Sequence, residues 1–433
     1  MCQDTAHSFD VGISNGTKPK NIELQLNDNT LTLKPAVGSI GTVSNGIRVL
    51  AYSKLTITNG NIVCSSEEDD NVKVGIANYG ELILDGVKVQ SGALTRYTVN
   101  NRGELTLKGD TVIQNGQVAP NDYSDSTGLV AITNDPYDLY YSTPVNATIN
   151  CDSENVVVGN IQIERYEIAK NHEKGNNVLN ISEGSFGSIV IPAEDSDTGI
   201  DVEGNIAGGS FEAASGVELQ NVMDLTVAGV AYQTPEKAVS IKLTDNLENG
   251  FDVGVSNGTA PKYFKLDLNQ KTITLRPAVG SVGTVSSGIR VLAYSKLEIK
   301  NGEVVCSDTL EDNVKVGIAN YGTLVLDSVD VKAGALTKYT INNRGELTLS
   351  GTTTVENAKV AHGDYSTGST YVAITNDPYT LYYTNDAVIN CDSKDVVVGN
   401  VQLETYSSAG NVKLNISEGS FGEVVAPTVS END

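Results

Sequence analysis

Short runs of alternating apolar and polar residues recur along the chain. Four runs share the pattern: Leu31-Thr-Leu33, Leu55-Thr-Ile57, Leu82-Ile-Leu84 and Leu105-Thr-Leu107. A period of two places the Leu and Ile side chains on one face of a β-strand and the polar side chains on the other. Successive runs begin 24, 27 and 23 residues apart (55 − 31, 82 − 55 and 105 − 82). This spacing predicts one winding of a coiled β-sheet for each run.

Asn and Gly residues precede several of these runs. Gly75-Ile-Ala-Asn-Tyr-Gly-Glu-Leu82 and Tyr97-Thr-Val-Asn-Asn-Arg-Gly-Glu-Leu105 both give strand, Asn, Gly, strand. Because Asn and Gly tolerate a left-handed backbone, we expect sharp corners at these residues. No long stretch has the helical period of 3.6. The one candidate, Glu164 to Lys174, is interpreted as a loop that leaves the coil.

The chain also repeats itself on a larger scale. The stretch from Phe9 to Tyr141 returns as Phe251 to Tyr383 with every residue moved by 242 (251 − 9), and the match continues to Val190 and Val425 with short deletions. One winding cannot bury its apolar face alone, whereas stacked windings build a continuous core. The sequence therefore predicts an all-β solenoid with an internal tandem duplication.

The predicted organisation has copy 1 in residues 1–190, connecting windings in 191–250 and copy 2 in 251–433. The middle segment is interpreted as further windings because Asn205-Ile-Ala-Gly-Gly-Ser-Phe211 echoes Asn180-Ile-Ser-Glu-Gly-Ser-Phe186. Two arrangements stay open: one continuous rod, or two rods joined by an irregular stretch near Pro192 to Gly199.

Composition fits a thin stacked core and excludes two partner classes. The chain is 39% apolar and 6% aromatic without Trp, so the interior must be built from Val, Ile, Leu and Ala. The net charge is −25, from 54 acidic and 29 basic residues. Such a surface repels phosphate backbones and anionic lipids, and no apolar stretch is long enough for a membrane span. We expect neither nucleic-acid binding nor membrane insertion.

Cysteines and acidic residues suggest no cofactor. Cys64 corresponds to Cys306 and Cys151 to Cys391, while Cys2 stands alone. The four paired cysteines follow apolar runs, which predicts small buried thiols on the inward face. The acidic run Glu67 to Asp70, matched weakly by Asp308, Glu311 and Asp312, admits a calcium interpretation. It lacks the EF-hand and calcium-nonapeptide spacings, so we interpret it as a solvated loop and predict no metal and no cofactor.

The start of the chain gives no export signal. Met1 to His7 lacks the basic residues and the apolar run of a signal peptide. Copy 2 is preceded by a strand-like lead-in, Val239 to Gly250, which has no equivalent before Phe9. Whether the chain is a fragment of a longer protein stays open.

One segment supports a resemblance. Leu266-Asp-Leu-Asn-Gln-Lys-Thr-Ile-Thr-Leu275, followed by repeated Ile-x-Asn-x-Gly-x-Leu-x-Leu units, resembles the right-handed parallel β-helix proteins of the pectate-lyase-like class, in the form found in surface and phage proteins of gut Gram-positive bacteria. The resemblance covers nearly the whole chain and implies a right-handed parallel β-helix. It says little of function, since that class includes lyases, hydrolases, adhesins and phage fibres or tailspikes.

The resemblance also implies where catalysis would be sought. Polysaccharide-cleaving members place two or three carboxylates, often with a basic residue, on adjacent windings of one face. The best match here is Asp85 with Arg102, repeated as Asp327 with Arg344, but a surface ion contact explains the pair more simply. Asn134-Asp135 and Asn376-Asp377 precede Pro, where an Asx turn is the simplest interpretation. We assign no catalytic residue.

Candidate binding residues are aromatic or basic. The runs Tyr137-Asp-Leu-Tyr-Tyr141 and Tyr379-Thr-Leu-Tyr-Tyr383 place rings on both faces of an extended segment, so at least one ring in each should point outward. The alternative is that these rings cover the end of a loop. Arg48 and Arg290 are outward positions of a strand, where they serve either a partner or only solvent. The candidate ligand-binding residues are Tyr137, Tyr140, Tyr141, Tyr379, Tyr382, Tyr383, Arg48 and Arg290.

Two hypotheses of different classes follow. The first is a non-enzymatic structural or adhesive rod, such as a phage virion protein of the capsid surface or a tail fibre, located on a virion or extracellular surface. Its partners would be other virion or surface proteins, a host-surface glycan and, through self-association, a homo-oligomer. The alternatives are a secreted polysaccharide lyase or hydrolase, which the residues favour less, and a bacterial cell-surface adhesin.

Overall fold

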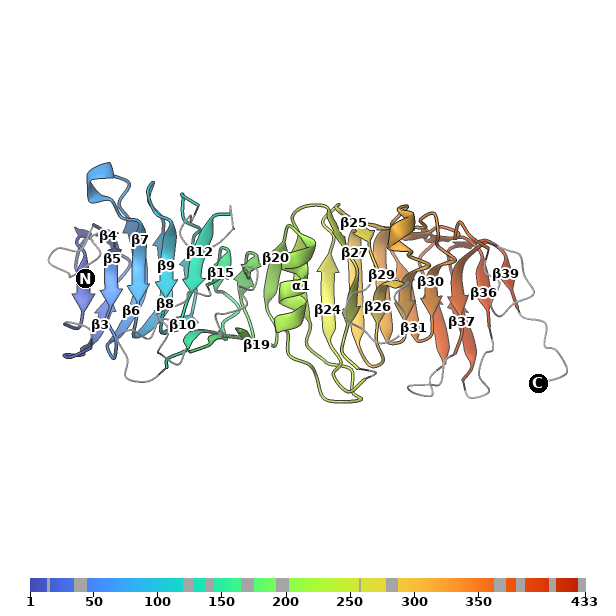
Figure 1. Ribbon diagram of the computed structural model, residues 1–433, viewed down its shortest axis with the longest axis horizontal. Helices are drawn as coiled ribbons and strands as arrows, with labels where there is room; N and C mark the ends of the chain where they lie inside the picture. Colours follow the sequence, from blue (N-terminus) through green and yellow to red (C-terminus); the bar gives the residue numbers. More distant parts are fainter. Residues whose placement is uncertain are drawn as a thin grey trace. The chain divides into compact units, whose positions relative to one another are not determined.

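The computed structural model describes residues 1–13, 16–34, 45–119, 128–136, 144–164, 175–191, 202–256, 258–277, 287–361, 371–378, 386–404 and 410–426. The chain forms two compact units: unit 1 comprises residues 1–212 and 224–226, and unit 2 comprises residues 213–223 and 227–433. Almost every element in both units is a β-strand, and the strands pair in parallel (Figure 1). The predicted all-β parallel solenoid is confirmed.

Each winding of unit 1 contributes strands to three parallel stacks. The first stack contains β3 (Asn21–Gln25), β6 (Lys54–Cys64), β8 (Glu81–Gln90), β10 (Glu104–Lys108), β13 (Ala147–Cys151), β16 (Asn177–Ile181) and β19 (Val202–Ile206). The second contains β1 (Thr5–Ala6), β4 (Thr30–Leu33), the second halves of β6 and β8, β11 (Val112–Ile113), β14 (Val157–Val158), β17 (Ser185–Phe186) and β20 (Ser210–Ala213). The third contains β2 (Phe9–Val11), β5 (Asn45–Val49), β7 (Val74–Asn78), β9 (Tyr97–Asn101), β12 (Val130–Asn134), β15 (Ile161–Ile163) and β18 (Ile189–Val190).

Unit 2 repeats this plan. Its first stack contains β21 (Val239–Leu243), β24 (Tyr263–Asp267), β27 (Lys296–Cys306), β29 (Thr323–Lys332), β31 (Glu346–Ser350), β34 (Ala387–Cys391) and β37 (Val412–Ile416). The second contains β22 (Leu247–Asn249), β25 (Thr272–Leu275), the second halves of β27 and β29, β32 (Thr354–Val355), β35 (Val397–Val398) and β38 (Ser420–Phe421). The third contains β23 (Phe251–Val253), β26 (Ser287–Val291), β28 (Val316–Asn320), β30 (Tyr339–Asn343), β33 (Val372–Asn376), β36 (Val401–Leu403) and β39 (Val424–Val425).

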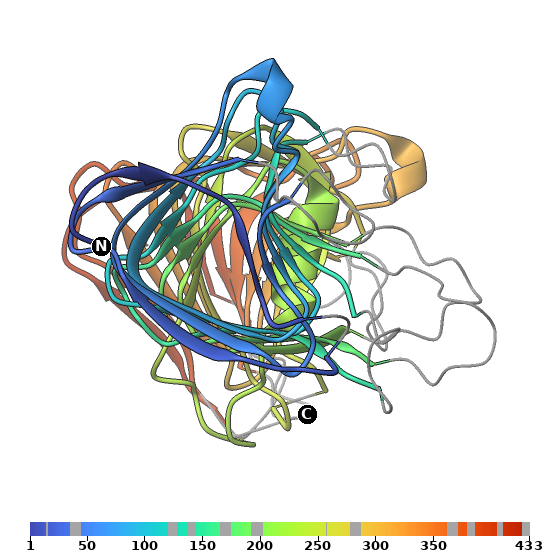
Figure 2. The same cartoon turned by 90° about the vertical axis from the view of Figure 1, so that its left-hand side faces the viewer.

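The core of unit 1 is made of aliphatic side chains stacked on their equivalents in the next winding. Leu55 pairs with Leu82, and Leu82 with Leu105, in the parallel register. All three are fully buried, and burying a Leu side chain contributes about 1.5–3 kcal/mol. Figure 2 shows the structure from the N-terminal end of this unit, so that its successive windings are seen one behind another around a shared interior. The alternating pattern of the sequence is therefore the pattern of inward and outward positions.

The predicted period is right for some windings and wrong for others. Leu31 pairs with Ile62 in the second stack, whereas the partner of Leu55 in the first stack is Ile22. That winding spans 33 residues (55 − 22) rather than the predicted 24. The next two windings have the predicted 27 and 23 residues, but Leu105 to Ile149 spans 44 (149 − 105). Windings differ in length because the segments that connect the same stacked strands contain different numbers of residues.

A buried ladder of asparagines lies where the third stack ends and the first stack begins. The Asn78 side-chain amide donates to Asn101 Oδ1 (2.8 Å), Asn101 to Asn134 Oδ1 (2.7 Å), and Asn134 to Asn177 Oδ1 (3.0 Å). All four side chains are fully buried. These bonds satisfy polar groups that would otherwise be costly to bury at the corner.

The corner prediction needs a correction. Asn78 and Asn101 do not provide left-handed corners, because they belong to the buried ladder. The left-handed backbone occurs instead at Asn59 (φ 52°) and Gly86 (φ 64°), between the first and second stacks, and at Tyr52 (φ 63°), between the third and first stacks. The glycine of the predicted motif has a different purpose: a Cβ at Gly80 would lie 2.2 Å from the Ser53 carbonyl oxygen. Only glycine allows this close approach of backbones.

The segment between the copies contains a helix that was not predicted. β19 pairs with β16, and Phe211 stacks on Phe186 with ring centroids 5.3 Å apart, so these strands add to the first and second stacks of unit 1. It is followed by α1 (Gly216–Leu225). The Glu218 backbone N–H donates to Ser215 Oγ (3.2 Å), and the Ala214 N–H donates to Glu218 Oε2 (2.7 Å). This capping box, Ser-x-x-Glu, is the signal that the search for a long helical period overlooked.

The four cysteines that correspond between the two copies point inward as predicted. Cys64, Cys151, Cys306 and Cys391 are at most 3% exposed, whereas Cys2 is exposed. Burial raises the pKa of the Cys64 thiol to about 11, because the apolar surroundings disfavour a thiolate. These thiols act as small apolar core residues.

Candidate functional site

The two copies carry the same buried arginine–aspartate pair. Arg102 Nη2 lies 3.0 Å from Asp135 Oδ2, and the Arg102 guanidinium lies 5.6 Å from the centroid of the Tyr79 ring. The second copy has Arg344 Nε 3.3 Å from Asp377 Oδ2, with Tyr321 beneath the guanidinium. These residues follow the third stack, outside the buried ladder. Both copies therefore contain an arginine–aspartate ion pair that was not predicted from the sequence.

Backbone register explains why these residues meet. The Arg102 N–H donates to the Asn78 carbonyl (2.7 Å), and the Asp135 N–H donates to the Asn101 carbonyl (2.9 Å). The Glu164 N–H continues the series to the Asn134 carbonyl (2.8 Å). Arg102, Asp135 and Glu164 therefore form a row with one residue from each winding. Neighbours in this row are separated by about one strand spacing of 4.8 Å.

Burial dominates the electrostatics of this row. The Asp135 side chain is 3% exposed. Burial raises the pKa of Asp135 to about 6, although the Arg102 charge opposes the shift. Within the part of the chain that the structure describes, three buried atoms, Asp135 Oδ1, Thr133 Oγ1 and Gln162 Oε1, have no hydrogen-bond partner. A carboxyl with a pKa near 6 suits general acid chemistry, but this carboxyl is enclosed and not presented to a polymer.

The catalytic candidates of the sequence analysis are not brought together. Asp85 ends the first-stack part of β8 and is paired in register with Lys108, whereas Arg102 precedes β10. Asp327 accepts a hydrogen bond from Ser328 Oγ (3.1 Å), and Arg344 pairs with Asp377. The interpretation of Asp85–Arg102 as a surface ion contact is wrong, since the partner of Arg102 is the buried Asp135. The interpretation of Asn134-Asp135 as an Asx turn did not foresee that Asp135 forms an ion pair with Arg102 of another winding.

The predicted binding arginines lie in bidentate ion pairs. Arg48 donates from Nε to Asp10 Oδ1 (2.8 Å) and from Nη2 to Asp10 Oδ2 (2.6 Å). Arg290 repeats this with Asp252 at 2.7 and 2.6 Å. Their side chains are only 7% and 4% exposed, so the alternative of a solvated arginine is wrong. Both pairs fasten the first strand of the third stack to the next one.

The six candidate tyrosines lie outside the described residues. Tyr137, Tyr140, Tyr141, Tyr379, Tyr382 and Tyr383 therefore stay a prediction.

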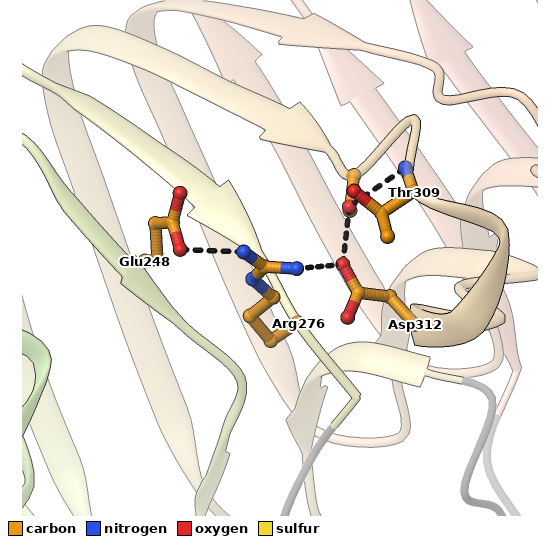
Figure 3. A network of polar contacts seen from close by, with 5 residues as sticks. Glu248, Arg276, Thr309 and Asp312 are labelled. Carbon is orange, nitrogen blue, oxygen red and sulfur yellow. Dashed lines mark hydrogen bonds and ion pairs between the residues drawn. The ribbon is translucent and has the colours of Figure 1, made fainter.

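The acidic run forms a short turn held by a side-chain hydrogen bond from a serine in each unit. In unit 1 the exposed Glu67, Glu68 and Asp69 lead into Asp70, which ends η1 (Glu68–Asp70) and accepts a hydrogen bond from Ser65. In unit 2, Arg276 lies between Glu248 (2.5 Å) and Asp312, the last residue of η2 (Leu310–Asp312) (Figure 3). The hydrogen bond from Ser307 is the main cause that lowers the pKa of Asp312. Among the described residues, no three His, Cys, Asp or Glu side chains are grouped as a metal site.

A groove at the start of the first stack recurs in both units. In unit 1 it has a volume of about 520 Å³ and is lined by Tyr52, Gly80, Glu81, Glu104, Asn146 and Thr148. In unit 2 it has about 250 Å³ and is lined by Tyr294, Gly322, Thr323, Glu346, Asp386 and Val388. The first four positions of each set differ by 242 and the last two by 240. We call these the Tyr52 groove and the Tyr294 groove.

An unusual backbone conformation holds the tyrosine of each groove. Tyr52 has φ 63° and Tyr294 has φ 62°, a left-handed conformation that is rare for a bulky residue. The ring packs on a glycine: a Cβ at Gly16 would lie 2.6 Å from Tyr52 Cδ2, and one at Gly258 would lie 2.7 Å from Tyr294 Cδ2. Tyr52 is 53% exposed. Such backbone outliers are enriched at functional sites, and neither sequence alternation nor composition would have identified them.

Each groove also holds two carboxylates, with different partners. In the Tyr52 groove, Glu81 pairs with Lys54 Nζ (2.5 Å), and Glu104 Oε1 accepts from the Asn150 amide (3.0 Å). In the Tyr294 groove, Glu346 accepts from Asn390 (3.0 Å). The pKa of Asp386 is lowered to about 2, mainly by its hydrogen bond from Lys413. The Tyr52 groove therefore offers an aromatic ring, negative charge and the Asn146 amide to a polar ligand, whereas the Tyr294 groove offers an aromatic ring and negative charge.

No protein-family model, no curated protein and no solved structure matches this chain.

Among the described residues, no helix is long and apolar enough to cross a membrane.

Proposed function

We propose that this chain is a non-enzymatic structural or adhesive solenoid that presents a repeated binding groove to a glycan or protein, as a component of a virion or other biological surface. The observation that carries the proposal is that a tyrosine with a left-handed backbone and its groove recur at equivalent positions of both copies, and that the Tyr52 side chain is 53% exposed. A flat ring flanked by carboxylate and amide groups offers a stacking face and hydrogen-bond partners to sugar hydroxyls. A ligand that engages two sites gains avidity without any new contact.

The differences between the grooves favour binding over catalysis. Acid–base cleavage of a glycan needs two carboxylates in a fixed relation. Glu81 and Glu104 are register neighbours in the Tyr52 groove, but the position of Glu81 is Thr323 in unit 2. The tyrosine and its backbone conformation are kept while the carboxylate pair changes. Duplication has retained the binding feature.

A binding experiment tests the proposal. The protein is applied to an array of bacterial and plant polysaccharides, and the affinity for each bound glycan is then measured by calorimetry. We expect Tyr52→Ala to weaken binding about tenfold, the loss of an aromatic stacking contact of about 1.4 kcal/mol. Tyr294→Ala should have a smaller effect because its groove is smaller. The matched control is Tyr371→Ala, whose side chain is 52% exposed and does not line either groove.

Two outcomes would contradict the proposal. One is that a glycan binds equally well to the Tyr52→Ala, Tyr294→Ala double variant. The other is release of new sugar ends from the bound polysaccharide, abolished by Glu104→Gln, which would establish the lyase or hydrolase alternative.

A further inference from the structure

In unit 2 a segment of the chain itself lies against the Tyr294 surface. The Gly229 N–H donates to the Pro261 carbonyl, and the Tyr232 N–H donates to the Gly258 carbonyl, both at 2.7 Å. The Tyr232 ring meets the Tyr294 ring edge-on, with centroids 5.8 Å apart and planes at 82°. Thr234 of the same segment lines the groove. Residues 227–237 are therefore bound by backbone hydrogen bonds and one aromatic contact.

The bound segment has a compact turn that its sequence requires. The Gln233 N–H donates to the Val230 carbonyl (3.1 Å), and Tyr232 has φ 61°. A Cβ at Gly229 would lie 2.7 Å from Pro235 Cγ, so glycine is needed where the segment folds back on its proline. The features that matter for binding are thus a tyrosine, a preceding glycine and a following proline.

Unit 1 has the same receiving surface, already formed. Gly16, Pro19 and Tyr52 are the residues 242 positions before Gly258, Pro261 and Tyr294. The isolated bridge Ile13–Lys18 corresponds to Val255–Ala260. The backbone N–H of Lys20 donates to Ser53 Oγ at 3.2 Å, as that of Lys262 does to Ser295 Oγ. The backbone that supplies the two acceptors in unit 2 therefore has the same fold in unit 1.

The two surfaces differ in exposure. Pro261 and Lys262 are buried, and the Lys262 ammonium donates to the Met223 carbonyl (2.6 Å). Pro19 and Lys20 are exposed, as is Tyr52. The larger volume of the Tyr52 groove agrees with this difference. The surface of unit 2, which holds residues 227–237, thus indicates that a polypeptide segment fits the exposed surface of unit 1.

We propose that the surface formed by residues 16–20 and Tyr52 binds a polypeptide segment that forms the same compact turn, places a tyrosine edge-on against the Tyr52 ring and donates backbone N–H groups to the Gly16 and Pro19 carbonyls. The partner is a protein segment of the Gly-x-x-Tyr-x-x-Pro kind found at residues 229–235. This inference rests on the proposed function, in that it names the class of partner for the Tyr52 groove. A polypeptide supplies N–H donors at the spacing of these two carbonyls, which a glycan does not.

A labelled peptide tests the inference on the full chain. A fluorescein-labelled peptide with the sequence of residues 226–237 is titrated with the protein, and binding is followed by fluorescence anisotropy. We expect saturable binding with a Kd of about 0.1–1 mM. Tyr52→Ala should weaken it at least about tenfold, whereas Tyr371→Ala, the matched control with an exposed side chain that lines neither groove, should leave it unchanged. Peptides carrying Tyr232→Ala or Gly229→Val should bind at least about tenfold more weakly, and they do not depend on the folding of a protein variant.

The inference is overturned if the peptide shows no saturation, if the two variant peptides bind as well as the parent, or if Tyr371→Ala weakens binding as much as Tyr52→Ala. Failure of peptide binding with Tyr52-dependent glycan binding intact removes this inference alone. Loss of both removes the proposed function as well.

Discussion

Replacing Asn101 by Ala is expected to lower the free energy of unfolding of unit 1 by about 3–4 kcal/mol. The Asn101 side chain is fully buried and donates to Asn134 Oδ1 (2.7 Å) and to the Thr148 carbonyl (3.0 Å), while its oxygen accepts from Asn78 (2.8 Å). Alanine leaves these partners buried without their bonds, and each such loss costs about 1 kcal/mol or more.

Urea unfolding followed by circular dichroism measures this effect. The control is Asn150→Ala, which interrupts a ladder of partly exposed amides in which Asn180 donates to Asn150 Oδ1 (2.8 Å) and Asn205 donates to Asn180 Oδ1 (2.9 Å). Water can replace those bonds, so we expect a change within about 0.5 kcal/mol. Asn343→Ala should repeat the Asn101 effect in unit 2, where Asn343 donates to Asn376 (2.7 Å). Equal losses for Asn101→Ala and Asn150→Ala would contradict the role of the buried ladder.

Replacing Arg102 by Met is expected to destabilise unit 1 by about 3–5 kcal/mol at pH 7.5, because it leaves the Asp135 carboxylate buried without its counter-ion. The loss should shrink as the pH falls. Burial already raises the pKa of Asp135 from 3.8 to about 6 in the intact pair, and loss of the arginine raises it further. A raised pKa means that the folded state holds its proton more tightly, so the corresponding stability is fully present below pH 3.8 and is lost as the pH rises through 6.

Unfolding curves at pH 5 and pH 7.5 for the single variants and the double variant check this prediction. Asp135→Asn removes the titrating group, so Arg102→Met should cost much less in that background and should show no extra pH dependence. The double comparison also cancels the general effect of pH on a chain with a net charge of −25. A loss that is the same at both pH values and in both backgrounds would mean that Asp135 is not the partner that matters.

Much of the fold was accessible from the sequence because inward positions repeat in register. Leu55, Leu82 and Leu105 gave the correct winding and the correct stack. Leu31 was assigned to the wrong stack, since first-stack and second-stack strands alternate in the same way and alternation alone does not say on which side of a corner a strand lies. The missed helix α1 is short, and its capping box at Ser215 and Glu218 was a stronger signal than its periodicity.

The candidate site was less accessible, for a physical reason. Arg102 and Asp135 lie 33 positions apart (135 − 102) and meet only because a long winding returns them to the same corner. The sequence shows both residues in both copies but not the length of that winding. The groove tyrosines were not predicted because the position of the Tyr52 and Tyr294 rings is set by a left-handed backbone. No residue pattern in this chain indicates that conformation.

Distances between spin labels on one outward row test the solenoid most directly. Glu23, Thr56, Ile83, Thr106, Asn150 and Asn180 are register partners on successive windings of unit 1. With Cys2→Ser and labels at Glu23→Cys and Asn180→Cys, we expect a separation of about 24 Å, and about 19 Å when the first label is moved to Thr56→Cys, because each winding adds about 4.8 Å. Separations that do not change by about one strand spacing when a label moves by one winding would contradict the account.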